Sequence, residues 1–152
     1  MKKLILFLIA TSFIFHLNAQ GQKQVYDSTL AKSLGADEYG MKSYVFVLLV
    51  TGSNNMEQGA ARDSIFSGHL KNIVRLADEG KLMIAGPFGD NDKSYRGIFI
   101  LNVKTIAEAK KLLDTDPAVH TKVLAAELYE WYGSAALGEY LEIHKKIQKT
   151  SF

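Results

Sequence analysis

The sequence predicts an α+β fold, in which a ferredoxin-like β-α-β-β-α-β sheet forms a dimeric α+β barrel and an extra helix follows at the C-terminus. Two helix-patterned segments alternate with four segments rich in β-branched and aromatic residues, in the order that this motif requires. One face of the resulting sheet has no helix to cover it, although its residues are apolar. The length of 152 residues fits one domain with a substantial core.

Composition excludes several classes of function. The chain has no cysteine, so disulfides, thiolate nucleophiles and cysteine metal sites are excluded. Its 18 basic and 16 acidic residues give a formal net charge of +2 without a basic stripe, so we expect no nucleic-acid partner. No HExxH, phosphate-binding loop or G-x-S-x-G motif is present. We therefore expect neither a metal nor a cofactor.

Residues 1–19 have the layout of a secretory signal peptide. Lys2 and Lys3 precede an apolar core at residues 4–15, and the small residue Ala19 follows. This core is shorter than the ~20 residues that a spanning helix needs, which favours cleavage over a permanent membrane anchor. We expect an exported protein, periplasmic or extracellular, with no stable membrane anchor after cleavage.

Residues 20–42 are polar and predict a tether with a short helix at residues 28–34. The domain is expected at residues 43–133, and its first strand, residues 43–52, ends at Gly52. After a loop, residues 64–79 have helical periodicity. Asp63 or Ser64 can cap this helix, and Gly80 suits the left-handed position after its end.

Three strands, one helix and a tail complete the predicted elements. Residues 81–88 form a strand that Gly86-Pro87 ends, and residues 95–103 form the next. Thr105 and Glu108 make a capping box for a second helix. Residues 123–133 form the last strand. Residues 134–152 are a helix and tail whose inner face would comprise Leu137, Tyr140, Leu141 and His144.

The uncovered sheet face predicts a homodimer. Two helices can cover only one face of a four-stranded sheet, yet the first and last strands are apolar on both faces. An exposed apolar patch of that size is unusual in a monomer. The simplest cover is a second copy, sheet against sheet. The tail helix is a rival cover for part of the face.

His69 is the first candidate catalytic residue, because it is the only polar side chain within the apolar arc of its helix. It could be a core histidine bonded to a backbone carbonyl or to Tyr95 or Tyr129. It could also be a general base, for which a partner must fix its tautomer. Asp116, before Pro117, fits the N-cap of a helical turn. One carboxylate oxygen can cap while the other faces a histidine.

Four further residues are candidates for substrate binding. Gly86 and Pro87 end a central strand, where a glycine lets a ligand approach the backbone, and Phe88 follows them. Glu127 shares a strand face with Tyr129. As an alternative, Glu127 is an ion-pair partner at the dimer interface.

Four stretches together resemble the YCII-related family: GHLKNIVRLADEGKLMIAGPF, GIFILNV, AEAKKLLDTDPAV and LAAELYEWYG. The resemblance covers roughly residues 43–133. It implies a dimeric α+β barrel with a histidine–aspartate pair in a cleft, matched here by His69 and Asp116, and a similarity to a dehalogenase of chlorinated muconolactone-type rings. Residues 120–122 depart from the small residues that the family often has there.

Three hypotheses follow. In the first, the protein is an exported enzyme that uses His69 and Asp116 for acid–base chemistry on a small carbonyl or lactone compound, in the manner of a lyase or dehalogenase. In the second, it is a non-catalytic small-molecule binding module. In the third, it is a structural dimer, and replacing His69 by leucine would stabilise it by removing a buried polar group.

Overall fold

A computed structural model describes residues 25–150, so the predicted signal peptide lies outside the described residues. The strands are β1 (Met41–Thr51), β2 (Leu82–Pro87), β3 (Tyr95–Leu101) and β4 (Leu124–Ser134). The helices are α1 (Ser28–Leu34), α2 (Ala60–Asp78), α3 (Ile106–Leu113), α4 (Pro117–His120) and α5 (Tyr140–Ile147), with a 3-10 turn, η1, at Ala135–Glu139. No helix in this range has the length and apolar composition needed to cross a membrane.

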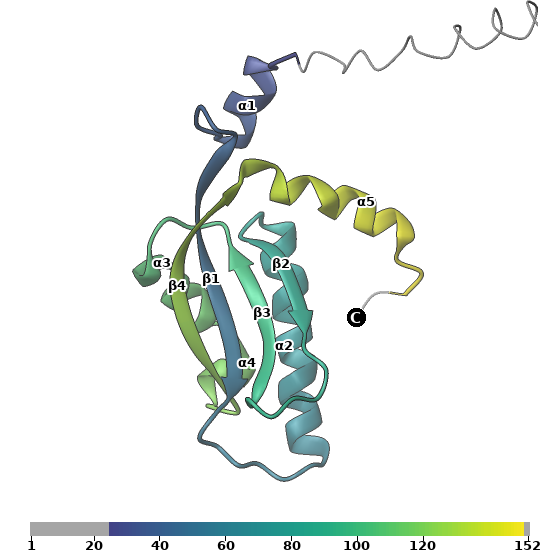
Figure 1. Cartoon of the computed structure of the whole chain (residues 1–152). Helices are drawn as coiled ribbons and strands as arrows, with labels where there is room; N and C mark the ends of the chain where they lie inside the picture. Colours follow the sequence, from purple (N-terminus) through teal and green to yellow (C-terminus); the bar gives the residue numbers. More distant parts are fainter. Residues whose placement is uncertain (1–24, 151–152) are drawn as a thin grey trace, which may run out of the picture.

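The strands form one antiparallel sheet in the order β2-β3-β1-β4 (Figure 1). This confirms the α+β class and the β-α-β-β-α-β order, with the single-turn helix α4 added between α3 and β4. Helices α2, α3 and α4 lie behind the sheet in Figure 1. The main core is between these two layers; it includes Val45, Val47, Leu76, Phe99, Leu113 and Leu124.

The opposite face of the sheet is covered at one end only. Tyr44, Met83 and Ile100 are buried there against Leu137 and Leu141 of the tail, as predicted. The other two tail residues predicted to face inward, Tyr140 and His144, are exposed and contact each other instead. The tail has this different register because its first turn is a 3-10 helix, which has fewer residues per turn than an α-helix.

Several element boundaries differ from the prediction. Helix α2 begins four residues early, after Gly59, so Asp63 lies in its first turn and caps nothing. Ala60 and Ala61 favour this extension, because alanine is the strongest helix former. The prediction for the other end holds, since Gly80 has a φ of 64° just after the helix. Strand β1 begins at Met41, two residues before the predicted domain boundary.

Candidate active site

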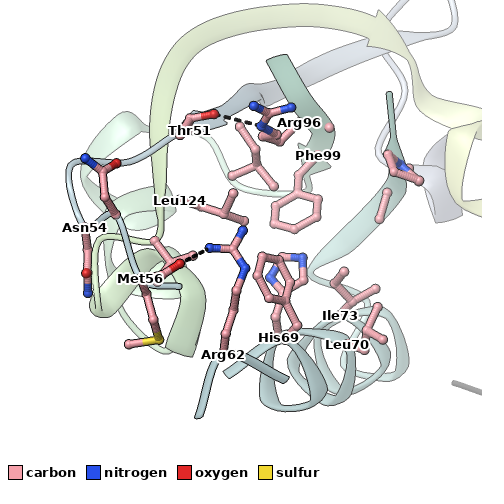
Figure 2. A pocket seen from close by; sticks show the side chains of 18 residues that line it. Thr51, Asn54, Met56, Arg62, His69, Leu70, Ile73, Arg96, Phe99 and Leu124 are labelled. Atoms are coloured by element: carbon pink, nitrogen blue, oxygen red, sulfur yellow. Dashed lines mark hydrogen bonds between the residues drawn. The ribbon is translucent and has the colours of Figure 1, made fainter. Parts of the chain in front are cut away.

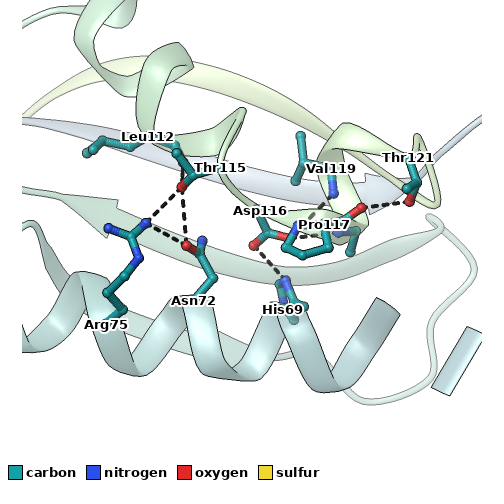
Figure 3. A network of polar contacts seen from close by, with 10 residues as sticks. His69, Asn72, Arg75, Leu112, Thr115, Asp116, Pro117, Val119 and Thr121 are labelled. Atoms are coloured by element: carbon teal, nitrogen blue, oxygen red, sulfur yellow. Dashed lines mark hydrogen bonds and ion pairs between the residues drawn. The ribbon is translucent and has the colours of Figure 1, made fainter. Parts of the chain in front are cut away.

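His69 and Asp116, 47 residues apart in the sequence, meet between α2 and α4 (Figure 3). His69 Nδ1 lies 2.7 Å from Asp116 Oδ2. Asp116 is completely buried, and His69 is 8% exposed. The structure therefore brings together the two residues predicted to be catalytic. Neither Tyr95 nor Tyr129 is the hydrogen-bond partner of His69.

The two carboxylate oxygens of Asp116 have separate partners. Oδ1 accepts hydrogen bonds from the backbone N–H of Ala118, at 2.9 Å, and of Val119, at 3.4 Å, and so caps α4. Oδ2 faces the imidazole of His69. A carboxylate can only accept, so Nδ1 of His69 is the donor in this pair. Nε2 is then the basic nitrogen in the neutral ring, and within residues 25–150 it has no hydrogen-bond partner.

Close packing of α2 on α4 places this pair. A Cβ added to Gly68 would lie 2.9 Å from Pro117 Cγ, so any larger residue beside His69 would push the two helices apart. Aromatic rings also hold the imidazole. It stacks on Phe99, with centroids 5.9 Å apart and planes at 23°, and meets the edge of Phe66 at 6.0 Å. The orientation of the imidazole is therefore fixed by packing as well as by the carboxylate.

A second polar network fixes the turn that carries Asp116. Arg75 Nη2 donates to Asn72 Oδ1 at 2.7 Å and to Thr115 Oγ1 at 2.9 Å, and the Thr115 hydroxyl donates to Leu112 O at 2.6 Å (Figure 3). Asn72 is buried one helical turn after His69, and its Nδ2 has no hydrogen-bond partner. These contacts join α2 to the residue immediately before Asp116.

A cavity of about 780 Å³ opens beside His69 (Figure 2). Its walls are mostly apolar and include Leu49, Phe66, Leu70, Ile73, Phe99 and Leu124. This volume accommodates a small organic ligand, whose typical pockets measure about 300–1,000 Å³. Between Val25 and Thr150, no cluster of three or more histidine, aspartate or glutamate side chains is placed to hold a metal ion.

Strained backbone supports the rim of the cavity. Ser94 and Lys122 both have a φ of 60°, which side-chain-bearing residues rarely adopt. Their carbonyls accept hydrogen bonds from the backbone N–H of Thr51, at 3.1 Å, and of Asn54, at 2.9 Å. Gly52 lies so close that an added Cβ would be 2.0 Å from Lys122 O. The loop after β1 is thereby fixed at the mouth of the cavity.

The four predicted substrate-binding residues separate into two groups. Gly86 and Pro87 line the cavity. Phe88 does not, because β2 ends before it; its side chain is 47% exposed and packs on Tyr95, 6.2 Å between centroids. Glu127 lies on the opposite face of the sheet. There it accepts a 3.0 Å hydrogen bond from the hydroxyl of Tyr129, which raises the pKa of that hydroxyl.

Two arginines in the cavity were not predicted from the sequence. Arg62 lies about two helical turns before His69 and therefore on the same face of α2. That spacing is a signal in the sequence, but the predicted helix began after Arg62. Arg96 is the extra residue of a β-bulge, because Leu49 pairs with Gly97 while the next residue of β1 pairs with Tyr95. The bulge turns Arg96 toward the cavity, against the alternation of a regular strand.

Comparison with known proteins gives one family and a distant structural likeness. The sequence model of the YCII-related domain matches residues 45–132. The solved structure of 5-chloro-2-hydroxyhydroquinone dehydrochlorinase (TftG) from Burkholderia phenoliruptrix AC1100, in complex with 2,5-dihydroxybenzoquinone, superimposes with a TM-score of 0.42 and 20% sequence identity, covering 57% of this chain and 92% of that chain. No curated protein matches the sequence.

Proposed function

The chain belongs to the YCII-related domain family, and from that premise we propose that it is an acid–base enzyme acting on a small carbonyl or lactone compound. The observation that carries the proposal is the hydrogen bond between His69 and Asp116 at the wall of the cavity. It leaves Nε2 as the free, basic nitrogen beside the space for a ligand. The apolar walls would exclude water from a bound ring, which strengthens electrostatic interactions there.

The chemistry that fits is removal of a proton from a carbon next to a carbonyl group. Nε2 of His69 takes the proton, and the electron pair of the C–H bond moves into an enolate. That pair then either accepts the proton at another carbon, which is isomerisation, or expels a leaving group such as chloride, which is elimination. The Asp116 carboxylate stabilises the imidazolium formed in the first step. No nucleophile is required, so a lyase or isomerase fits better than an acyl transferase.

Deuterium exchange tests this proposal without knowledge of the leaving group. Small cyclic ketones and lactones, with and without chlorine, would be incubated with the full chain in D₂O and followed by proton NMR. We expect exchange faster than in buffer for at least one compound. General-base catalysis typically contributes about 10²–10⁴-fold, so His69→Gln should abolish the acceleration, and Asp116→Asn should reduce it strongly.

The exposed pair of His120 and Asp114, with 3.3 Å between Nδ1 and Oδ1, provides the matched control. His120→Gln should leave the exchange rate unchanged. Full activity of His69→Gln would contradict the proposal. Binding of a compound without exchange, detected as a shift in melting temperature, would instead favour the non-catalytic binding module.

We also propose that two copies pair through the uncovered part of the sheet. The tail leaves this region free, and it includes half-buried Leu48 and Ile98 and the 52% exposed Tyr129. A stable interface buries about 800 Å² per partner, and apolar side chains at its centre support such pairing. Leu48→Glu should convert the dimer to a monomer in light scattering coupled to size-exclusion chromatography. A monomeric wild-type protein would refute the pairing.

Export stays a proposal that rests on residues 1–19 alone. Expression of the full chain with a C-terminal tag, followed by N-terminal sequencing of the tagged product, tests it. A mature terminus near Gln20 in the exported fraction is the expected result. An uncleaved chain in the cytoplasmic or membrane fraction would contradict it.

A further inference from the structure

We propose that the substrate carries a carboxylate and that Arg62 and Arg96 bind this group, while His69 acts on another part of the same molecule. The inference rests on the proposed function, because it names the substrate class of the same cavity. It starts from the two arginines that line the cavity with His69 (Figure 2).

Both arginines are held in place by neutral groups. Arg62 is half-buried; its Nη1 donates to Met56 O at 3.0 Å, and its guanidinium lies over the ring of Phe66, 5.2 Å from the centroid. Arg96 Nε donates to Thr51 Oγ1 at 2.7 Å. Each guanidinium has further N–H donors, and no described residue accepts from them. The two side chains are thus oriented but keep most of their hydrogen-bonding capacity.

Neither charge is neutralised by the part of the chain that the structure describes. No carboxylate side chain is among the residues that line the cavity, and no ion pair within residues 25–150 includes Arg62 or Arg96. Arg75, the remaining arginine of the sequence, provides the contrast. Its Nη1 is 2.7 Å from Glu79 Oε1 on the outside of the same helix. The arginines without a carboxylate partner are therefore the two in the cavity.

Two like charges beside apolar walls favour an anionic guest. The planar fork of a guanidinium matches a carboxylate with two parallel hydrogen bonds, which gives both affinity and orientation. Arg62 and His69 are seven residues apart on one helix face, which corresponds to about 10 Å along the axis. Because the arginine side chain bends into the cavity, the two sites suit opposite ends of one small acid. The apolar space between them suits a ring or a short carbon chain.

Ligand titration by NMR tests this inference independently of turnover. The probes would be acetate, crotonate and benzoate, each paired with its neutral amide, and inorganic phosphate. The full chain would be titrated as wild type, Arg62→Gln, Arg96→Gln, the double variant and Arg62→Lys. Lys71→Gln is the control, since it removes a positive charge from the exposed side of α2. Melting temperatures would show that each variant is folded.

We expect at least one acid to bind more tightly than its amide. Each single change to glutamine should weaken acid binding about tenfold, the typical effect of losing a charge-assisted hydrogen bond, and the double variant should bind acid and amide alike. Arg62→Lys should be intermediate, and Lys71→Gln should match wild type. Equal affinity for acids and amides in wild type, an equal loss in Lys71→Gln, or tighter binding of phosphate would each overturn the inference.

These outcomes are separable from failure of the proposed function. His69→Gln should keep the preference for each acid over its amide, because that preference comes from the two arginines. If acids bind in a way that depends on the arginines but no deuterium exchange occurs, this inference is retained and the catalytic proposal is refuted. If neutral ketones exchange deuterium as fast as the corresponding keto acids do, the catalytic proposal is retained and this inference is refuted.

Discussion

Asp116 has two hydrogen-bonding roles, and different substitutions affect them differently. One carboxylate oxygen caps α4 and the other binds His69. Asp116→Ala removes both. Loss of an N-cap costs about 1 kcal/mol. Loss of a hydrogen bond to a charged group costs about 1.5–3 kcal/mol. We therefore expect Asp116→Ala to lower the free energy of unfolding by about 3 kcal/mol. Asp116→Asn keeps a cap acceptor at the same position, so its effect should be nearer 1 kcal/mol.

A double-mutant cycle with His69→Leu isolates the contribution of the pair. Without the imidazole, Asp116→Ala removes the cap but also removes the unpaired buried oxygen, so it should cost at most about 1 kcal/mol. The difference of at least about 2 kcal/mol between the two backgrounds is the coupling energy between His69 and Asp116. His69→Leu by itself should destabilise the protein, since it leaves Oδ2 buried without a partner.

The assay is urea unfolding of all four proteins at neutral pH, followed by circular dichroism. A coupling energy below about 0.5 kcal/mol lies within the usual error of additivity and would refute this account of the pair. Asp116 would then be a helix cap alone. Stabilisation by His69→Leu would support the structural dimer hypothesis instead. Nitrogen chemical shifts of His69 give a second check, because the pair requires the proton of the neutral ring to be on Nδ1.

Three further changes test other parts of the structure. Gly52→Ala should destabilise the protein by about 1–3 kcal/mol and perturb ligand binding, because its Cβ would overlap Lys122 O; an unchanged urea midpoint would contradict the close approach. Thr105→Ala removes the side-chain cap of α3 and should cost about 1 kcal/mol in the same assay, whereas no loss would mean that the capping box is not formed. The hydrogen bond from Tyr132 lowers the pKa of the Asp37 carboxyl, so its stabilisation is present at neutral pH and is lost as the pH falls below about 4. Wild type and Asp37→Asn should therefore converge in stability at acid pH, and a gap that persists there would contradict the assignment.

The fold could be predicted from the sequence because its signals are local. The capping box of α3, the Asp-Pro start of α4 and the apolar strands each depend on neighbouring residues. The His69–Asp116 pair is what the resemblance to the YCII-related family implies, whereas the residues alone also allow a core histidine. The geometry of the pair could not be predicted from the residues, because the approach of α2 to α4 depends on Gly68 fitting against Pro117.

The arginine pair could not be predicted for two different reasons. The sequence predicts a loop at Arg62, because the residues before it are polar, whereas helix α2 begins at Ala60. By the alternation of a regular strand, the side chain of Arg96 should point away from the cavity. The pairing register of β1 with β3 shows the extra residue, and the bulge turns the side chain of Arg96 toward the cavity. Phe88, predicted to bind substrate because it follows Gly86 and Pro87, lies outside the cavity.

The bulge at Arg96 also bears on how the cavity could change during evolution. His69 and Asp116 belong to helices that are packed in the core, where insertions and deletions are poorly tolerated. The bulge lies at the start of β3, and deletion of one residue there would restore regular pairing with β1. A single codon deletion would thus take one of the two arginines out of the cavity while leaving Arg62, His69 and Asp116 in place. If the proposed roles hold, one half of the carboxylate site can thus be lost or regained in evolution without disturbing the histidine–aspartate pair, whereas Arg62 shares helix α2 with His69.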